Sequence, residues 1–179
     1  MSLHDSVVAE LTDWSAPNPD QDALRHCVLA FLQARPDGCQ RSCVPGHITA
    51  STLVIRRDRA LLTLHPRLGR WVQLGGHCEQ SDPDIAAAAL REATEESGIG
   101  DLRLDPRLAA IHVHPVTCSL GVPTRHLDLQ FLAHAPDGAE PVISEESLDL
   151  RWWPLDAAPG EFDAGLAQLV AAARRRSST

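Results

Sequence analysis

The chain contains no lysine, because all sixteen of its basic residues are arginine. This absence excludes Schiff-base chemistry at a lysine, and it excludes the phosphate-binding loop that depends on a lysine. Acidic residues outnumber basic residues by 24 to 16, which gives a formal net charge of -8. A chain this acidic is a poor partner for nucleic-acid polymers. It can still bind phosphate groups if metal ions lie between the two anions.

Long apolar runs are also missing, and none approaches the ~18–20 residues that cross a bilayer. The first residues, MSLHDSVVAELTDW, are acidic and have no basic segment ahead of an apolar stretch, so we expect no signal peptide. The five cysteines form an odd set, which indicates reduced thiols rather than a disulfide framework. These features predict a cytoplasmic protein with no membrane association.

The hydrophobic pattern changes from helical to extended along the chain. Residues 1 to about 35 predict two helices, separated at Asn18-Pro19, and a loop rich in Pro, Gly and Cys follows over 36–46. Strands are then predicted at 47–55, 60–65, 71–74, 108–113, 126–134 and 148–153, and a C-terminal helix at 161–176. Strands lie on both sides of one central helix without strict alternation, which favours a mixed sheet with helices packed on it.

The central helix is predicted over 83–97. Asp82 is the expected N-cap, Pro83 would take the first helical position, and Gly98 suits the left-handed end of the helix. At ~100° per residue, one stripe of this helix is small and apolar enough to pack closely on a sheet. This stripe comprises Ala86, Leu90, Ala93 and Ser97.

Three glutamates occupy a different stripe of the same helix. Glu92, Glu95 and Glu96 are spaced i, i+3 and i+4, so their carboxylates converge within one turn. Like charges at this spacing repel, and the arrangement makes sense if cations bind there. Oxygen ligands of this kind suit Mg²⁺ or Mn²⁺. Arg91, four residues before Glu95, can hold one carboxylate in place. A solvated polar face is the alternative explanation of the glutamates alone.

The segment from Gly76 to Ile99 resembles the Nudix box, G-x5-E-x7-R-E-U-x-E-E-x-G-U, in which U is a bulky apolar residue. Gly76 matches the opening glycine, and residues 91–99 match the second half, with Ala93 as a small U. In the first half Asp82 stands in place of glutamate, and eight residues instead of seven separate it from Arg91. The extra residue falls where a loop enters the helix, so we expect the loop to absorb it.

The resemblance implies a Nudix-type α/β/α sandwich with a central mixed sheet. It implies a Nudix hydrolase domain over 36–179, preceded by a helical extension over 1–35. Such an enzyme hydrolyses a diphosphate linkage in a nucleoside diphosphate linked to another moiety, X. The implied partners are a small-molecule diphosphate substrate and Mg²⁺ or Mn²⁺, with no nucleic-acid polymer. A homodimer is left open.

The resemblance also implies a role for each residue of the box. Glu92, Glu95 and Glu96 would be metal ligands, with the carbonyl of Gly76 as a further ligand. Arg91 would orient the glutamates. Glu95 is the first choice for the general base, although another glutamate or a residue outside the box is an alternative.

Two further groups of residues are candidate substrate contacts. Four polar residues alternate on otherwise apolar strands, so that the members of each pair face one side: His112 and His114, and His126 and Asp128. They would line a substrate pocket, or else a solvent-facing sheet edge. Arg67 and Arg70 precede the box and would meet a terminal phosphate, although a turn between two strands explains them equally well.

Three alternatives stay open. Cys39-x3-Cys43-x3-His47 has a spacing that could bind zinc, with His26-Cys27 as a source of a fourth ligand, but free cysteines in a loop are the simpler explanation. A non-catalytic nucleotide sensor is one alternative function. An enzyme similar to isopentenyl diphosphate isomerase is another; it needs a cysteine beside its active-site histidine, but here Gly75 and Gly76 occupy that stretch and Cys78 lies after His77.

Overall fold

The structure is a computed structural model that describes residues 1–117, 121–144, 147–156 and 164–177. The expected start of the last helix at 161 and the thiol of Cys118 lie outside these residues. Within the described part of the chain, every helix is too short or too polar to span a lipid bilayer.

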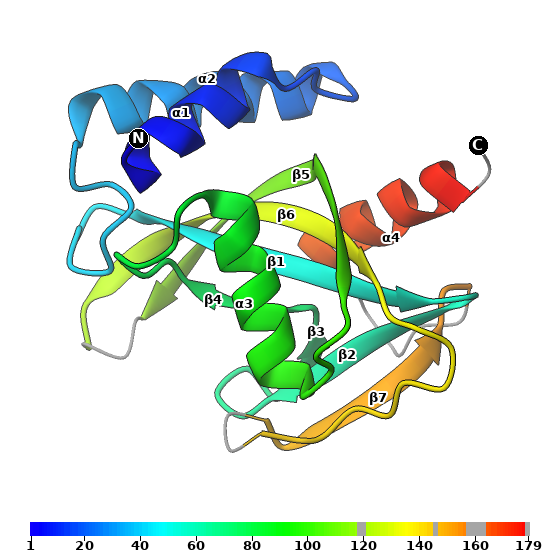
Figure 1. Ribbon diagram of the computed structural model, residues 1–179. Helices are drawn as coiled ribbons and strands as arrows, with labels where there is room; N and C mark the ends of the chain where they lie inside the picture. The colour runs from blue at the N-terminus through cyan, green and yellow to red at the C-terminus, as the bar shows by residue number, and fades with distance from the viewer. Residues whose placement is uncertain (118–120, 145–146, 157–163, 178–179) are drawn as a thin grey trace.

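Two helices at the N-terminus lie side by side over one end of the sheet, as Figure 1 shows in blue. They are α1 (Leu3–Asp13) and α2 (Pro19–Ala34). Pro19 takes the first turn of α2, and the side chain of Asn18 caps the helix by accepting a hydrogen bond from the backbone N–H of Gln21 at 2.9 Å. The expected break at Asn18-Pro19 is therefore the start of the second helix.

The sheet is mixed, as expected, and β1 (His47–Arg56) lies at its centre. β1 pairs in parallel with β6 (Pro123–His134), and β6 pairs antiparallel with β5 (Arg103–Thr117). On its other side, β1 pairs antiparallel with β2 (Arg59–His65) and β4 (Leu74–His77). β3 (Arg70–Val72) and β7 (Asp149–Pro154) both pair with β2. The single strand expected at 71–74 is thus two strands, which pair with different neighbours.

Helices cover both faces of the sheet, with α3 (Ile85–Ser97) on one and α4 (Ala164–Ser177) on the other (Figure 1). The alternation along β1 decides which side chains meet which helix. Ile48 and Ala50 pack in one buried cluster with Ala88 and Ala89 of α3. Leu53, on the opposite face of β1, packs in a cluster with residues of α4. The expected α/β/α sandwich is confirmed.

The N-terminal helices share the larger of these cores. Val7, Leu11, Val28 and Leu32 are each 0% exposed and belong to the same cluster as Ile48 of β1. The helical region expected over residues 1–35 is therefore packed against the sheet and α3. The division into an extension over 1–35 and a domain over 36–179 stays a prediction.

The start of α3 differs from the expectation. The helix begins at Ile85 with Asp84 as its N-cap, whose side chain accepts a hydrogen bond from the backbone N–H of Ala87 at 2.8 Å. Asp82 does not cap this helix, because its carboxylate accepts hydrogen bonds from the backbone N–H of Glu79 and from Arg91. The end of the helix is as expected, since Gly98 has a φ of 67° in the left-handed region.

Candidate active site

Arg91 connects the loop after β4 to the acidic turn of α3. Its Nε lies 2.9 Å from Oδ1 of Asp82 and its Nη2 lies 3.0 Å from Oδ2, which is a two-bonded fork. Nη1 donates to Glu92 at 2.9 Å and to Glu95 at 3.2 Å. Nη2 also donates to the backbone carbonyl of His77 at 3.1 Å. One guanidinium therefore fixes two of the three glutamates and the end of β4 relative to each other.

The charges in this network shift each other's pKa. Hydrogen bonding to Asp82 is the main reason that the pKa of Arg91 is raised. Burial alone would raise the pKa of Asp82, but the hydrogen bonds from Arg91 and from the backbone of Glu79 outweigh it and lower that pKa. Both partners therefore stay charged through the neutral pH range.

The two glycines before His77 let the backbone of β4 approach the carboxylates. The N–H of Gly75 donates to Oε2 of Glu96 at 3.0 Å. A Cβ added at Gly76 would lie 2.5 Å from Oε2 of Glu92, so a side chain cannot fit there without displacing that carboxylate. Gly75 has a φ of 152°, and a Cβ there would lie 2.5 Å from the carbonyl oxygen of Ala50. The glycine pair is therefore part of the carboxylate site.

The three glutamates differ in their exposure at this junction of β4 and α3. The side chain of Glu92 is 13% exposed, whereas that of Glu95 is 61% exposed. Glu92 and Glu96 each lie against one of the two glycines, and Glu95 extends toward solvent from the same turn. Hard divalent cations favour oxygen ligands, and the carboxylates of this turn supply them.

This combination of fold and acidic helix turn can be compared with known proteins. A family model described as NUDIX domain matches residues 45–173, which is most of the chain. The chain belongs to the Nudix family. No curated protein matches this sequence. The Nudix assignment identifies the protein as a hydrolase, of a family that typically uses a divalent metal.

Solved structures share the Nudix fold at low sequence identity. A hydrolase of the NUDIX family from Clostridium perfringens is 24% identical with a TM-score of 0.57, over 73% of this chain and 97% of that chain. A C. elegans Ap4A hydrolase is 19% identical with a TM-score of 0.54, over 73% and 97%. A UDP-X diphosphatase is 14% identical with a TM-score of 0.56, over 99% and 97%. At these identities the likeness establishes the fold.

The predicted substrate contacts fall in two places. Arg67 and Arg70 are exposed in the hairpin that joins β2 to β3. The strand residues lie on one face of the sheet, where His112 and His114 stack at 5.2 Å between ring centroids and His114 lies 5.3 Å from His126. Both assignments stay predictions.

Asp128 is 3% exposed and lies opposite His112 in the pairing of β5 with β6. Its carboxylate accepts hydrogen bonds from Thr49 at 3.0 Å, Ser51 at 2.6 Å and Gln130 at 3.0 Å. These donors come from β1 and β6, so Asp128 helps to hold a polar layer between the two parallel strands.

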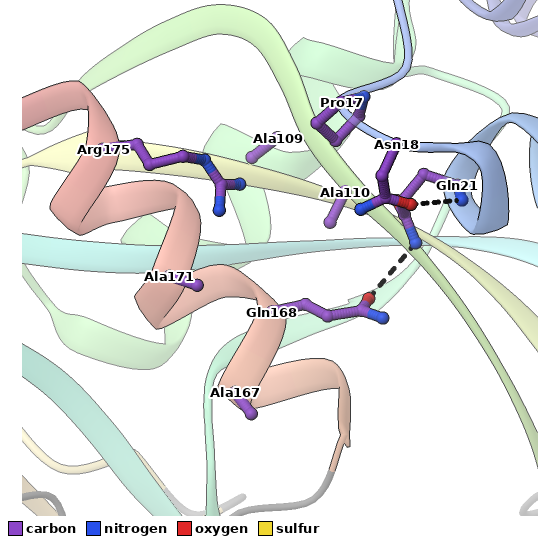
Figure 2. Close-up of a pocket in the computed structure, with 9 residues that line it drawn as sticks. All are labelled: Pro17, Asn18, Gln21, Ala109, Ala110, Ala167, Gln168, Ala171 and Arg175. Atoms are coloured by element: carbon purple, nitrogen blue, oxygen red, sulfur yellow. Dashed lines mark hydrogen bonds between the residues drawn. The ribbon is translucent and has the colours of Figure 1, made fainter.

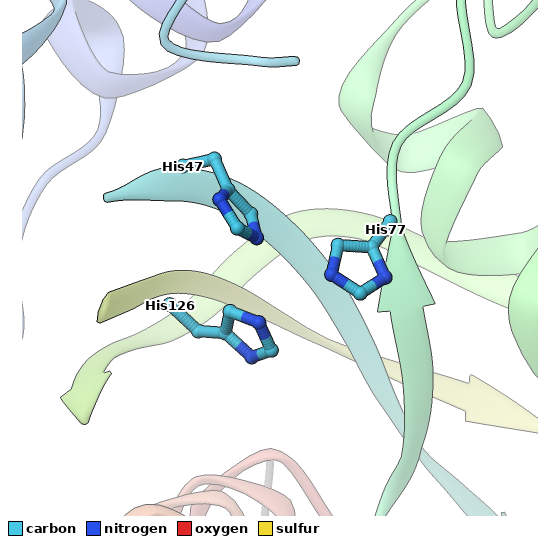
Figure 3. A group of neighbouring side chains, drawn as sticks. All are labelled: His47, His77 and His126. Atoms are coloured by element: carbon cyan, nitrogen blue, oxygen red, sulfur yellow. The ribbon is translucent and has the colours of Figure 1, made fainter. Parts of the chain in front are cut away.

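Nothing in the sequence indicated that His47 and His77 lie close together. His47 and His77 lie beside His126, with the three rings facing one another in Figure 3. Among the described residues, this trio is the only group of three or more His, Cys, Asp or Glu side chains whose possible ligand atoms all lie within 4.8 Å of one another. His47 therefore lies with two histidines. Cys39 and Cys43 are free cysteines, and the alternative zinc grouping of these cysteines with His47 is not among the candidate metal clusters of the described residues. Only the pairing of β4 and β6 with β1 reveals the histidine trio, since the residues are far apart in sequence.

A separate cavity of about 300 Å³ lies between α4, β5 and the start of α2 (Figure 2). Gln21 crosses it to meet Gln168 at 3.3 Å, and Arg175 borders it on α4. Its lining includes no residue of α3 or β4, so this cavity is not part of the carboxylate site.

Proposed function

We propose that this protein hydrolyses a diphosphate linkage in a nucleoside diphosphate linked to another moiety, using Mg²⁺ or Mn²⁺ at the carboxylates of α3. The observation that carries the proposal is the close approach of Gly75 and Gly76 to two carboxylates of the acidic turn. That approach leaves no room for side chains between β4 and the acidic oxygens.

Glu92, Glu95 and Glu96 would hold the metal, together with the carbonyl of Gly76. A divalent ion held there would neutralise the diphosphate and lower the pKa of bound water. Arg91 orients Glu92 and Glu95 through the hydrogen bonds from its Nη1. Glu95 is the most suitable general base, because its side chain is 61% exposed and can reach an attacking water.

The substrate is proposed to be a small nucleotide or nucleotide derivative. Solved structures with this fold include a UDP-X diphosphatase and an Ap4A hydrolase, which supports that class without choosing a member. Arg67 and Arg70 are proposed to contact a terminal phosphate. The strand residues are proposed to line the pocket: His112, His114, His126 and Asp128. A cytoplasmic location, a homodimer and the extension over 1–35 also stay predictions.

The alternatives have weaker support. All three box glutamates are present, which favours hydrolysis over a non-catalytic nucleotide sensor. Burial raises the pKa of the Cys78 thiol, so a thiolate is disfavoured there. That shift argues against a cysteine-dependent isomerase.

The test is release of phosphate or pyrophosphate from a panel of nucleoside triphosphates, nucleotide sugars, ADP-ribose and dinucleotide polyphosphates. Each reaction runs with Mg²⁺, Mn²⁺ or EDTA. We expect metal-dependent turnover that is lost in Glu96→Gln. Glu140→Gln is the matched control, since the Glu140 side chain is 82% exposed and distant in sequence from the box. Turnover that survives both EDTA and Glu96→Gln would contradict the mechanism.

A further inference from the structure

Three histidines from three different strands gather at one end of the sheet (Figure 3). His47 begins β1, His77 ends β4 and His126 lies near the start of β6. The parallel register places His47 directly opposite His126, and His77 is opposite Thr49, two residues along β1. The three ring centroids are separated by 5.0 to 5.1 Å.

The spacing of the ring nitrogens is close to that of a metal site. One nitrogen from each ring lies within 4.8 Å of the other two. A tetrahedral zinc ion with Zn–N bonds of about 2.0–2.1 Å holds its nitrogen ligands roughly 3.4 Å apart. Rotation of the imidazole rings about their side-chain bonds can close this difference while the strands stay in register.

The hydrogen bond at His47 prepares that ring to bind a cation. Its Nδ1 lies 3.3 Å from the backbone carbonyl of Cys43. A carbonyl oxygen can only accept, so Nδ1 carries the proton and Nε2 carries the lone pair. A metal-binding histidine usually has this arrangement, with its second nitrogen donating to a carbonyl or carboxylate.

Two nitrogens of the cluster lack the partners that buried polar atoms normally have. Nε2 of His47 and Nε2 of His126 are buried, and neither has a hydrogen-bond partner within the described part of the chain. Buried polar groups without partners are rare in folded proteins. A single cation between the rings would satisfy both atoms.

We propose that His47, His77 and His126 form a binding site for one divalent transition-metal ion of the Zn²⁺ type, separate from the carboxylate site on α3. Imidazole nitrogens favour zinc and its neighbours, whereas Mg²⁺ and Mn²⁺ favour oxygen. Three protein ligands leave the fourth tetrahedral position to water or to an oxygen of a bound molecule.

An ion at the histidines would also affect the carboxylate site, because His77 lies beside the glycine pair. His77 directly follows Gly76, and its carbonyl accepts a hydrogen bond from Arg91. An ion shared by the three histidines therefore ties β4 to β1 and β6, and it holds the glycine pair in the position that the carboxylates require. The proposal depends only on the histidine geometry and not on the reaction proposed above.

The test is a Co²⁺ titration of the full chain, without an added histidine tag, followed by visible absorption. Four-coordinate Co²⁺ absorbs much more intensely than the six-coordinate ion that carboxylates and water provide. We expect intense bands that saturate at one equivalent, disappear on addition of Zn²⁺ and persist in excess Mg²⁺. His77→Gln and His126→Gln should each lose the bands. Circular dichroism verifies that each variant folds. Because two ligand variants are used, a folding defect in one still leaves the other as a valid test.

Two controls locate the ion. His134→Gln changes an exposed histidine at the far end of β6 and should retain the bands. Glu96→Gln should also retain them, even where it abolishes turnover, which separates this site from the proposed reaction. The proposal is overturned by weak six-coordinate absorption alone in the wild type, or by intense bands that survive in both histidine variants. Loss of the bands in Glu96→Gln, with retention in the histidine variants, would place the ion at the carboxylates instead.

Discussion

Asp82 and Arg91 form a two-bonded ion pair across nine residues, with N···O distances of 2.9 and 3.0 Å. The Asp82 side chain is 5% exposed and that of Arg91 is 21% exposed. This pair explains how the chain accommodates a shorter acidic residue and one extra residue between Asp82 and Arg91. The turn after β4 brings Asp82 over the start of α3, and Asp84 caps the helix in its place.

Removing this charge should weaken both the fold and the site. In Asp82→Asn the guanidinium loses its charged partner, so we expect the free energy of unfolding to fall by about 1–3 kcal/mol. Activity should fall by about 10–100-fold, mainly in kcat, because Arg91 no longer holds Glu92 and Glu95 firmly. Urea unfolding and steady-state kinetics measure the two effects.

Asp137→Asn is the control for this pair. Asp137 pairs with Arg57 at 2.9 Å, but its side chain is 67% exposed. We expect that substitution to leave the free energy of unfolding nearly unchanged, because exposed ion pairs contribute little to stability. Equal effects of the two substitutions on stability and kcat would refute the role given to Asp82.

The close approach at Gly76 predicts a steric effect on catalysis. In Gly76→Ala the new Cβ would lie 2.5 Å from Oε2 of Glu92, so that carboxylate must move. A displacement of this size at a reacting centre can cost about 100-fold in rate. Gly100→Ala is the matched control, because a Cβ there has no atom within 4 Å. Wild-type kcat in Gly76→Ala would show that this contact is unimportant.

The buried histidines predict acid sensitivity of the metal-free protein. Burial is the main cause of the lowered pKa of His47, His77 and His126, and Arg41 lowers all three further by charge repulsion. His114 also contributes to the shift at His126. A histidine with a folded pKa below its unfolded value of 6.5 stabilises the fold fully above that value. The stabilisation is lost as the pH falls from 6.5 toward the folded pKa, because the unfolded chain takes up more protons.

This loss can be measured by urea unfolding in EDTA between pH 7.5 and pH 5. At about 1.4 kcal/mol per pH unit, His77 and His126 each account for up to about 2 kcal/mol at pH 5, less where solvent reaches the ring. His126→Gln should make the curve shallower, and His134→Gln should leave it unchanged. A wild-type stability that is flat over this range is the result that rules out the effect.

The packing of the N-terminal helices predicts that they are part of the folded unit. Leu32 of α2 is 0% exposed in the cluster shared with the sheet, so Leu32→Ala should lower the free energy of unfolding by about 2–5 kcal/mol. Leu148→Ala is the control, since Leu148 is 61% exposed. Thermal unfolding should show one transition in both variants. A separate early transition in Leu32→Ala, with the main one unchanged, would indicate that the helices fold independently.

Short-range features of the site were predictable from the sequence. The placement of Glu92, Glu95 and Glu96 within one turn of α3 follows from helix periodicity, and the end of α3 follows from the freedom of Gly98 to adopt a positive φ. The start of the same helix was wrongly predicted. Asp82 and Asp84 are equally good caps by residue type, and the competing bond from Arg91 decides between them.

Local spacing and side-chain chemistry therefore determine the acidic turn, the glycine pair and the alternation of polar groups along the strands. The histidine cluster depends instead on how strands that are distant in sequence pair. His47 and His126 meet only because β1 and β6 pair in parallel, and His77 joins them only because β4 pairs with the first half of β1. A one-residue shift in either register would move a ring to the opposite face of the sheet. Registers between distant strands are set by the packing of the whole core, so only the tertiary structure could bring these three rings together.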